Sequence, residues 1–388
     1  MKNLSCINYK KSSDLLSAIK RNSVNSLKKQ NRENVVFSGL DHRVCAKDLN
    51  EVRDEHFLIN DCQNCIFFIL DKLNSINIEH VKDCIIVLNI VETSITISNS
   101  SSTTIYAICQ QFRMLHCSKI DVHLGTIFYP VIEFSKNIIF HRLLYNSSTL
   151  EEQFLDSVIS PFNLDYDSVQ DLTPAETYSN YEISNEIISR DLSPMNVISS
   201  SLNDFTDRCF EESSRILEDI SCLNLFNSPW LKYSIYANPD KSLIPNIYRP
   251  HKRLLFETEN NDLIVLTKSV GENLRLHGLS IMNLIQRYIN HQITFTFEGY
   301  FSSEDIIRIF PMNKKRFYLH KGIMILINLM LTDNVPDERE RLSNIIMNYC
   351  HQTLAKNNSI LLMSNFVTTE NMKGIQKELD NFFRQRIG

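Results

Sequence analysis

The sequence predicts a mainly β domain, a parallel β-helix, followed by a small α/β domain. Between about residues 35 and 145, short runs rich in Ile, Val, Phe and Thr follow one another, and such residues suit a pleated, half-buried surface. The turns between these runs recur at intervals of about 16 to 22 residues if the stretch SNSSS (98–102) is counted as one of them, which is typical of stacked coils. Beyond residue 254, strand-like and helix-like segments alternate instead, which indicates a separate α/β domain.

The composition is that of a globular protein. The chain has 388 residues, of which 43% are hydrophobic and 22% charged, so it is long enough for two or three domains. The net charge of −5 argues against a nucleic-acid binder, which would carry a basic surface. The sequence contains no uninterrupted run of about 18 apolar residues, so we expect no membrane span. The N-terminus lacks the apolar core of a signal peptide. We therefore expect a cytoplasmic protein whose ten cysteines are mostly reduced thiols.

The first 33 residues form a basic N-terminal arm. Residues 1–32 carry eight Lys or Arg and one acidic residue. An amphipathic helix over residues 12–29 would place Leu15, Leu16, Ile19 and Leu27 on one face. This helix has two interpretations: a packed surface helix, or a helix that binds a membrane surface or a partner.

Residues 34–175 are expected to hold the β-helix. The connections between the runs are too short for the crossover helices of a doubly wound sheet. One coil cannot bury its own apolar face, so the core forms only when coils stack. Four turn-like stretches close successive runs: NDCQNC (60–65), VKDC (81–84), LHC (115–117) and FSKN (134–137).

The cysteines of these turns have a structural interpretation. Stacking predicts that Cys62, Cys84 and Cys117 lie above one another as small buried residues at one corner. Cys62 and Cys65 also form a CxxC motif, which could ligate zinc. A structural zinc site usually needs a second paired motif at close spacing, and none follows. We therefore expect core thiols and no metal.

Residues 176–250 read as an acidic, irregular linker with one helix. Residues 151–222 contain sixteen Asp or Glu and three Arg. The stretch 172–186 is rich in turn-forming residues and predicts a loop, and an amphipathic pattern predicts a helix over 201–220. The stretch 227–250 contains four prolines and predicts a linker that packs against another part of the chain.

Residues 251–388 are expected to form the second domain. The alternation of strands and helices is typical of a small α/β or ferredoxin-like sandwich. The expected strands cover 262–269, 293–301, 323–331 and 359–366, and the expected helices cover 271–290, 302–311, 337–355 and 368–385.

Four separated motifs carry a family resemblance. They are FSGL (37–40), FLINDCQNC (57–65), CQQFR (109–113) and PVIEFSKNIIF (130–140). With these motifs in order, residues 34–175 resemble the TBCC domain. Within that family they resemble the X-linked retinitis pigmentosa branch more than the tubulin-folding cofactor C branch. The resemblance implies a right-handed parallel β-helix.

The resemblance also implies a function. Members of the family are GTPase-activating proteins, and the arginine of the QQFR motif is their arginine finger, which falls here on Arg113. Gln110, Gln111, Glu133 and Leu172 fall on the GTPase-facing surface, and Leu172 replaces a phenylalanine contact. The implied partner is an Arf-like small GTPase in its GTP form, acting in ciliary or flagellar trafficking of lipidated proteins. GTP and Mg²⁺ would come with that partner, so the chain itself needs no cofactor.

Strand geometry agrees with this assignment. In an extended strand Gln111 and Arg113 point to one side, while Gln110 and Phe112 point to the other. Glu133 lies one coil further on and could rest beside Arg113, which would order the long side chain. The alternative interpretation is an ordinary salt bridge on a strand, which contributes little.

Other functions remain open at this point. A tubulin-folding cofactor would use the same arginine on β-tubulin, and a GTPase-binding scaffold would have no catalytic effect. The start Met1-Lys2 lacks the glycine needed for N-myristoylation, so we expect at most peripheral membrane association, through the basic arm or a partner. The expected location is cytoplasmic, with the base of a cilium or flagellum implied by the resemblance.

The C-terminal block resembles, through the order of its elements, a nucleoside-diphosphate-kinase-like domain. A working kinase of that type needs a histidine nucleophile, and residues 359–366 contain none. His320 precedes a strand and His351 lies in a predicted helix. We therefore expect a catalytically inactive interaction module.

Overall fold

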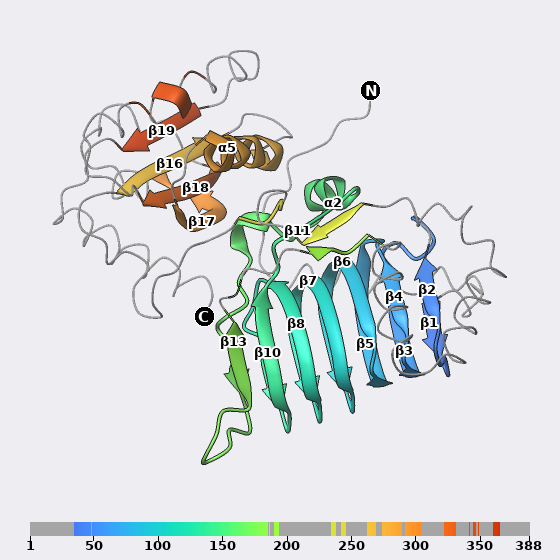
Figure 1. Cartoon of the computed structure of the whole chain (residues 1–388). Coiled ribbons are helices and arrows are strands. Elements are labelled where there is room, and N and C mark those ends of the chain that lie inside the picture. Colours follow the sequence, from blue (N-terminus) through green and yellow to red (C-terminus); the bar gives the residue numbers. More distant parts are fainter. Residues whose placement is uncertain are drawn as a thin grey trace, which may run out of the picture.

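The computed structural model describes most of the chain between residues 35 and 193 and parts of residues 234–364 (Figure 1). The described ranges are 35–47, 49–184, 186, 190–193, 234–237, 242–245, 262–268, 274–288, 292–303, 322–330, 341, 344–346, 348 and 360–364. The helices predicted over 12–29, 201–220 and 368–385 lie outside these ranges, as do His320 and His351. Within the described part, no helix has the length and apolar character needed to cross a membrane.

The first domain is the predicted parallel β-helix. One face contains β1 (Val36–Ser38), β3 (His56–Gln63), β5 (Leu73–Lys82), β9 (Val131–Glu133) and β12 (Gln170–Asp171). A second face contains β2 (Val44–Lys47), β4 (Ile66–Ile69), β8 (Ser118–Thr126), β10 (Lys136–Arg142) and β13 (Tyr181–Ser184). The long strands β6 (Ile85–Ser98) and β7 (Ser101–Leu115) contribute to both faces. Every pair among these described strands of the β-helix is parallel, and the strands stand side by side as a wall in Figure 1.

Like residues stack in the core of the β-helix. Phe57 pairs with Ile76, Ile76 with Ile95, and Ile95 with Phe112, and all four side chains are buried. Burial of one such side chain contributes about 1.5–3 kcal/mol relative to exposure. The stacking of coils, rather than any one coil, therefore supplies the core.

One corner of the β-helix is built from repeated left-handed residues. Two positions per coil have φ between +46° and +56°, and they form two rows: Asp61, His80, Asn99, His116 and Phe134, and then Asn64, Asp83, Ser102, Lys119 and Asn137. Asn and Asp tolerate this conformation better than most residues. Backbone bonds connect the coils at the corner, for example Asn99 N to Leu115 O at 3.0 Å. The same turn thus recurs in each coil, which keeps the strands in register.

The corner cysteines are buried thiols, but they do not form the single column that the sequence predicts. Cys62 pairs in register with Val81. Cys84 lies beside Cys65 instead, and the backbone N–H of Cys65 donates to Cys84 Sγ at 3.4 Å. Cys62 and Cys84 therefore belong to neighbouring columns, three residues apart around the same corner. Among the described residues, no group of three or more His, Cys, Asp or Glu is arranged to hold a metal.

A capping layer covers one rim of the β-helix. It contains α2 (Leu150–Asp156), the 3₁₀ turn η2 (Pro161–Asn163) and an antiparallel sheet of β11 (Tyr145–Ser147), β15 (Ile235–Ala237) and β14 (Arg190–Asp191). Leu243 and Ile244 are buried in the same layer, so these described residues of the 227–250 stretch pack on the β-helix. The prediction of a loop over 172–186 is wrong at β13, which adds a parallel strand beside β10.

The second domain has a ferredoxin-like sheet. Its elements are β16 (Asp262–Lys268), α5 (Leu274–Tyr288), β17 (Gln292–Phe301), β18 (Gly322–Met330) and β19 (Ile360–Ser364). The antiparallel strand order β17-β18-β16-β19 equals the order expected when a β-α-β-β-α-β chain folds into one sheet. The sandwich prediction is therefore confirmed for the strands. Most residues of the helices predicted at 302–311 and 337–355 lie outside the described ranges.

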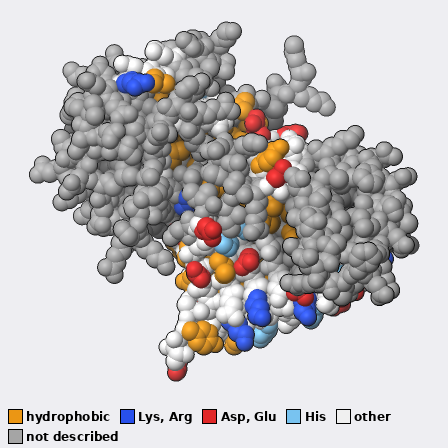
Figure 2. All heavy atoms as spheres, in the orientation of Figure 1, with side chains coloured by type: hydrophobic (Ala, Val, Ile, Leu, Met, Phe, Trp, Pro, Cys, Tyr) orange, Lys and Arg blue, Asp and Glu red, His pale blue; other side chains and the backbone are white. Residues whose placement is uncertain are grey.

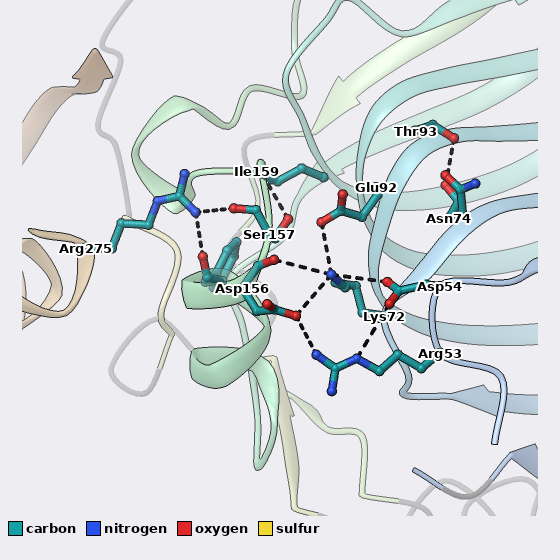
Figure 3. A network of polar contacts seen from close by, with 11 residues as sticks. Arg53, Asp54, Lys72, Asn74, Glu92, Thr93, Asp156, Ser157, Ile159 and Arg275 are labelled. Carbon is teal, nitrogen blue, oxygen red and sulfur yellow. Dashed lines mark hydrogen bonds and ion pairs between the residues drawn. The ribbon is translucent and has the colours of Figure 1, made fainter. Parts of the chain in front are cut away.

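The two domains meet where α2 contacts α5 and where η2 contacts β17. Arg275 of α5 donates from Nη1 to the carbonyl oxygens of Phe154 and Ser157, both at 2.6 Å. Phe162 of η2 is 1% exposed and packs in the core of the second domain. Figure 3 shows Arg275 on one side of this segment and the ion pairs of Lys72 on the other.

Candidate functional site

The candidate site is an outward face of the β-helix that we call the arginine face. It consists of outward residues from β7, β9 and the residue after β12: Gln111, Arg113, Leu115, Val131, Glu133 and Leu172. These segments are neighbours, because β7 pairs with β9 and β9 pairs with β12. Residues that lie far apart in the sequence thus form one continuous surface.

Burial alternates along the end of β7. Gln111 and Arg113 are exposed, whereas Phe112 and Met114 between and after them are buried. The two buried side chains anchor the strand in the stacked core, so their neighbours must point outward. Gln111 and Arg113 therefore share the outer face, on a strand that parallel neighbours hold on both sides.

Arg113 has no ion pair and no side-chain hydrogen bond with any described residue. Its in-register partner on the next coil is Val131, while Glu133 lies opposite Leu115. Glu133 is half-buried on the same face, but it does not fix the guanidinium in this structure. The five N–H donors of the guanidinium are therefore available to an incoming anion.

Gln110 contributes mainly through its backbone. Its side chain is half-buried, and its carbonyl oxygen accepts from Phe128 N at 3.0 Å and from Thr126 Oγ1 at 2.9 Å. These bonds fix the loop 127–130 next to Gln111. Of the two glutamines, Gln111 is the one whose side chain is exposed beside Arg113.

Leu172 lies on the same face, at its far end. Its N–H donates to Ile132 O at 3.0 Å, so it continues the row that contains Leu115 and Glu133. Its side chain is 51% exposed. The structure thus brings Arg113, Glu133 and Leu172 onto one surface, although 59 residues separate the first and the last in sequence.

Apart from Leu172, the sequence reasoning missed the segment that supports this surface, residues 164–173, which we call the strap. Asp165 exchanges two backbone bonds with Thr126, at 2.7 and 2.8 Å, and Thr173 Oγ1 accepts from Phe134 N at 2.6 Å. Asp165 and Asp171 accept bonds from nearby backbone N–H groups. Such aspartates are turn formers, and they were the available signal.

The geometry defines a class of domain. A parallel β-helix displays one unpaired arginine from the middle of its wall, with a glutamine beside it and apolar side chains around it. Residues 54–172 match the family model described as tubulin binding cofactor C. This region is therefore similar to a TBCC domain, in agreement with the sequence motifs.

Individual relatives share this region. The chain is 32% identical to Protein XRP2 of Homo sapiens over 164 residues, which is 42% of this chain and 47% of the human protein. It is 30% identical to Protein XRP2 of Danio rerio over 43% of this chain and 44% of that protein. A TBCC domain-containing protein 1 of Xenopus tropicalis is 29% identical over 25% of this chain and 18% of that protein. The chain is thus similar to Protein XRP2 over this region, and it spans about half the length of the curated relatives it matches.

Proposed function

We propose that this chain is a GTPase-activating protein that supplies Arg113 in trans to an Arf-like small GTPase in its GTP form. The observation that carries the proposal is the state of Arg113: it is exposed, unpaired within the described residues and mounted on a rigid strand. The likeness to Protein XRP2 over the TBCC domain supports it.

The chemistry follows from the guanidinium. Negative charge grows on the phosphate oxygens when GTP is hydrolysed, and a small GTPase lacks enough donors to stabilise it. An arginine inserted from a partner stabilises this charge and raises the rate by about 10³–10⁵. Because the planar fork can bond two oxygens at once, a lysine should not replace it. The neighbouring Phe112 and Met114 hold the strand in the core, which lowers the cost of placing the side chain.

The remaining residues of the face have supporting roles in this proposal. Gln111 would bond the partner close to its nucleotide, and Glu133 would contact the partner or Arg113 once the face is covered. Leu172 would provide an apolar contact. GTP and Mg²⁺ belong to the partner, which would act in ciliary or flagellar trafficking of lipidated proteins, with this chain cytoplasmic or peripherally bound at the base of the organelle.

Single-turnover hydrolysis tests the proposal. Each purified Arf-like GTPase of the source organism is loaded with GTP and mixed with the full chain, with Arg113→Ala, with Arg113→Lys and with Lys119→Ala. Lys119→Ala is the matched control, because it removes an exposed cation outside the arginine face. We expect the wild type and the control to accelerate one GTPase at least about 100-fold, while both Arg113 variants lose nearly all of the effect. Equal acceleration by Arg113→Ala, or no acceleration of any GTPase, would contradict the proposal.

A second candidate is a tubulin-folding cofactor, which the description of the matched family model favours. The same arginine would then act on tubulin-bound GTP. Retention of tubulin by the chain, without GTP-dependent binding of any small GTPase, would favour this candidate. A scaffold without catalytic effect would bind a GTP-loaded GTPase with unchanged hydrolysis.

A further inference from the structure

Large apolar side chains are exposed on the surface that carries Arg113. Ten large hydrophobic residues are exposed in the described part of the chain, and five of them lie on or beside the arginine face. We call these five the apolar rim: Leu115, Phe128, Tyr129, Phe134 and Leu172, with exposed fractions of 36 to 58%. Single exposed apolar residues are normal, but a cluster marks an interaction surface.

Two rim residues belong to the ordered loop before β9. Phe128 N donates to Gln110 O, and Thr126 Oγ1 donates to Phe128 O at 3.1 Å and to Gln110 O. The loop is therefore tied to the strand that carries Gln111 and Arg113. Phe128 and Tyr129 remain 44% and 56% exposed, although the loop itself is held in place.

Phe134 is the most informative member of the rim. It occupies a left-handed corner position with φ of +46°, where equivalent coils have Asp61, His80, Asn99 and His116. A bulky residue in this conformation is strained, yet its ring is 58% exposed. The ring stacks on His116 with centroids 5.0 Å apart. The stack on His116 leaves more than half of the side chain exposed, and this exposed part points to a contact with another molecule.

We propose that the apolar rim selects the partner, a GTP-loaded small GTPase whose surface beside the nucleotide site is apolar. This inference rests on the proposed function. The unpaired guanidinium of Arg113 requires an anionic group on the partner, and the apolar rim requires an apolar surface on the same partner. A protein that holds phosphates at the edge of an apolar surface offers both, whereas a free nucleotide lacks the area.

An anionic membrane offers both features as well, but the face fits it less well. Attraction to anionic lipids increases with the number of Lys and Arg near the surface, and the arginine face has Arg113 beside the acidic Glu133. A protein partner requires one well-placed cation instead. Figure 2 shows apolar, basic and acidic side chains interspersed on the visible part of the β-helix.

The proposal assigns separate effects to the rim and to the finger. Residues far from the reacting atoms that bind ground state and transition state equally change the half-saturating concentration and leave the maximal rate unchanged. Loss of Arg113 should do the reverse. Phe134→Asn is the sharpest variant, because it removes the ring and Asn suits the left-handed position, which Asn99 occupies in an equivalent coil.

The test uses the full chain and purified Arf-like GTPases of the source organism loaded with a non-hydrolysable GTP analogue. Affinity is measured for wild type, Phe134→Asn, Leu172→Ser and the control Val158→Ser, which alters an apolar residue that is 65% exposed outside the rim. We expect Phe134→Asn and Leu172→Ser each to weaken binding about tenfold or more, while the control binds as wild type. With GTP, the saturating hydrolysis rate of both rim variants should equal that of wild type.

Three outcomes would overturn the inference. Binding by both rim variants equal to the control would remove the rim from the interface, and the proposed function would stand if Arg113→Ala still abolished acceleration. A lowered saturating rate with unchanged affinity would assign the rim to the chemical step. Phe134→Asn could also abolish binding to vesicles of anionic phospholipid without an effect on GTPase binding, and this result would make the rim a membrane contact. By contrast, weakened GTPase binding by the rim variants with no acceleration by wild type would refute the proposed activity and retain the rim as an interface.

Discussion

Asn89 is a fully buried polar residue in an apolar strand of the β-helix. Its Nδ2 donates to Leu70 O at 2.9 Å and to Thr149 Oγ1 at 3.0 Å. Its Oδ1 accepts from Tyr145 OH at 2.9 Å and from Ser147 Oγ at 3.1 Å. Because every partner but Leu70 lies in residues 145–149, this side chain connects the β-helix to the capping layer.

Replacement of Asn89 by leucine should destabilise the protein although the two side chains are similar in size. Leucine leaves several buried donors and acceptors without partners, and one such group costs about 1–3 kcal/mol. We expect a loss of roughly 3 kcal/mol in the free energy of unfolding, measured by urea denaturation. Asn77→Leu on the exposed side of β5 is the control, and it should change stability by less than about 0.5 kcal/mol. A similar stability for the two variants would contradict this account.

At the scale of single residues, the sequence predicts which side chains are exposed better than it predicts which residues they contact. The outward position of Arg113 follows from the period of two along a strand, which is a local property. The partners of Asn89 lie up to 60 residues away, and no local pattern specifies them. Glu133 shows the same limit: the sequence places it one coil from Arg113, but the register sets it opposite Leu115.

At the scale of elements, helix α2 is fastened to the first coils by ion pairs (Figure 3). Lys72 is 9% exposed, and its Nζ lies 3.2 Å from Asp54, 3.2 Å from Asp156 and 3.5 Å from Glu92. Burial acts to lower the pKa of Lys72, but the hydrogen bonds that Lys72 donates to Asp54 and Asp156 outweigh it and raise the pKa. The lysine therefore stays charged and links α2 to two coils.

Lys72→Met should loosen α2 while it keeps the apolar stem. The change leaves Glu92, whose side chain is 21% exposed, without its cation, and breaking such a partly buried pair costs about 1–3 kcal/mol, less than for a fully buried one. We expect that loss in thermal or urea unfolding, with faster hydrogen exchange over residues 150–156. Lys82→Met is the control, because Lys82 is 58% exposed beside Asp83. An equal response of the two variants would rule out a special role for Lys72.

Asp156 makes the same attachment sensitive to acid. Its hydrogen bonds with Lys72 and then Arg53 lower its pKa below the ordinary value of 3.8. The unfolded chain then takes up the proton first as the pH falls, so this contribution to stability is present above about pH 4 and is lost below it. Urea unfolding between about pH 5 and pH 3 should show a smaller decrease for Asp156→Asn than for wild type. Parallel curves would contradict the assignment.

The elements themselves follow closely from the sequence, because a repeat with short apolar runs allows few folds. The geometry of the corners between the strands does not follow from the sequence in the same way. The sequence places Cys62, Cys84 and Cys117 in one column, whereas the turn has two left-handed positions that separate neighbouring columns by three residues. Strand β13 was missed because its polar residues satisfy a loop pattern, and it is the neighbouring β10 that makes it a strand.

At the scale of the whole molecule, the two domains are joined by polar and apolar contacts. Besides its bonds to Phe154 O and Ser157 O, Arg275 pairs with Glu298 at 2.9 Å. Asn163 exchanges hydrogen bonds with the backbone of Glu298, at 2.7 and 2.9 Å. A Cβ on Gly278 would lie 2.8 Å from the ring of Phe162, so α5 needs glycine where that ring packs.

Arg275→Ala should release the second domain from the first. Two carbonyl oxygens and the carboxylate of Glu298 lose a charged donor, and hydrogen bonds to charged groups contribute about 1.5–3 kcal/mol. We expect increased hydrogen exchange in residues 154–163 and easier proteolysis between the domains, while the strands of the β-helix stay protected. Arg113→Ala, which removes an exposed arginine with no partner in the described residues, is the matched control and should leave both readouts unchanged. Unchanged exchange in Arg275→Ala would show that apolar contact alone joins the domains.

The sequence predicts two domains and their order but not this junction. Each domain has its own periodic pattern, whereas Arg275, Glu298 and Phe162 are single residues in otherwise ordinary contexts. Only the packing of α5 against η2 brings them together.

Phe162 lies within the first domain by sequence and inside the second by packing. A protein cut after residue 175 would leave this benzene ring in water, next to three carbonyl or amide groups that had been paired across the junction. Such a truncated protein should aggregate during purification. A missense change at Phe162 would destabilise the second domain, although the residue belongs to the first domain by sequence. Geneticists who interpret variants of this chain should therefore count Phe162 with the C-terminal half.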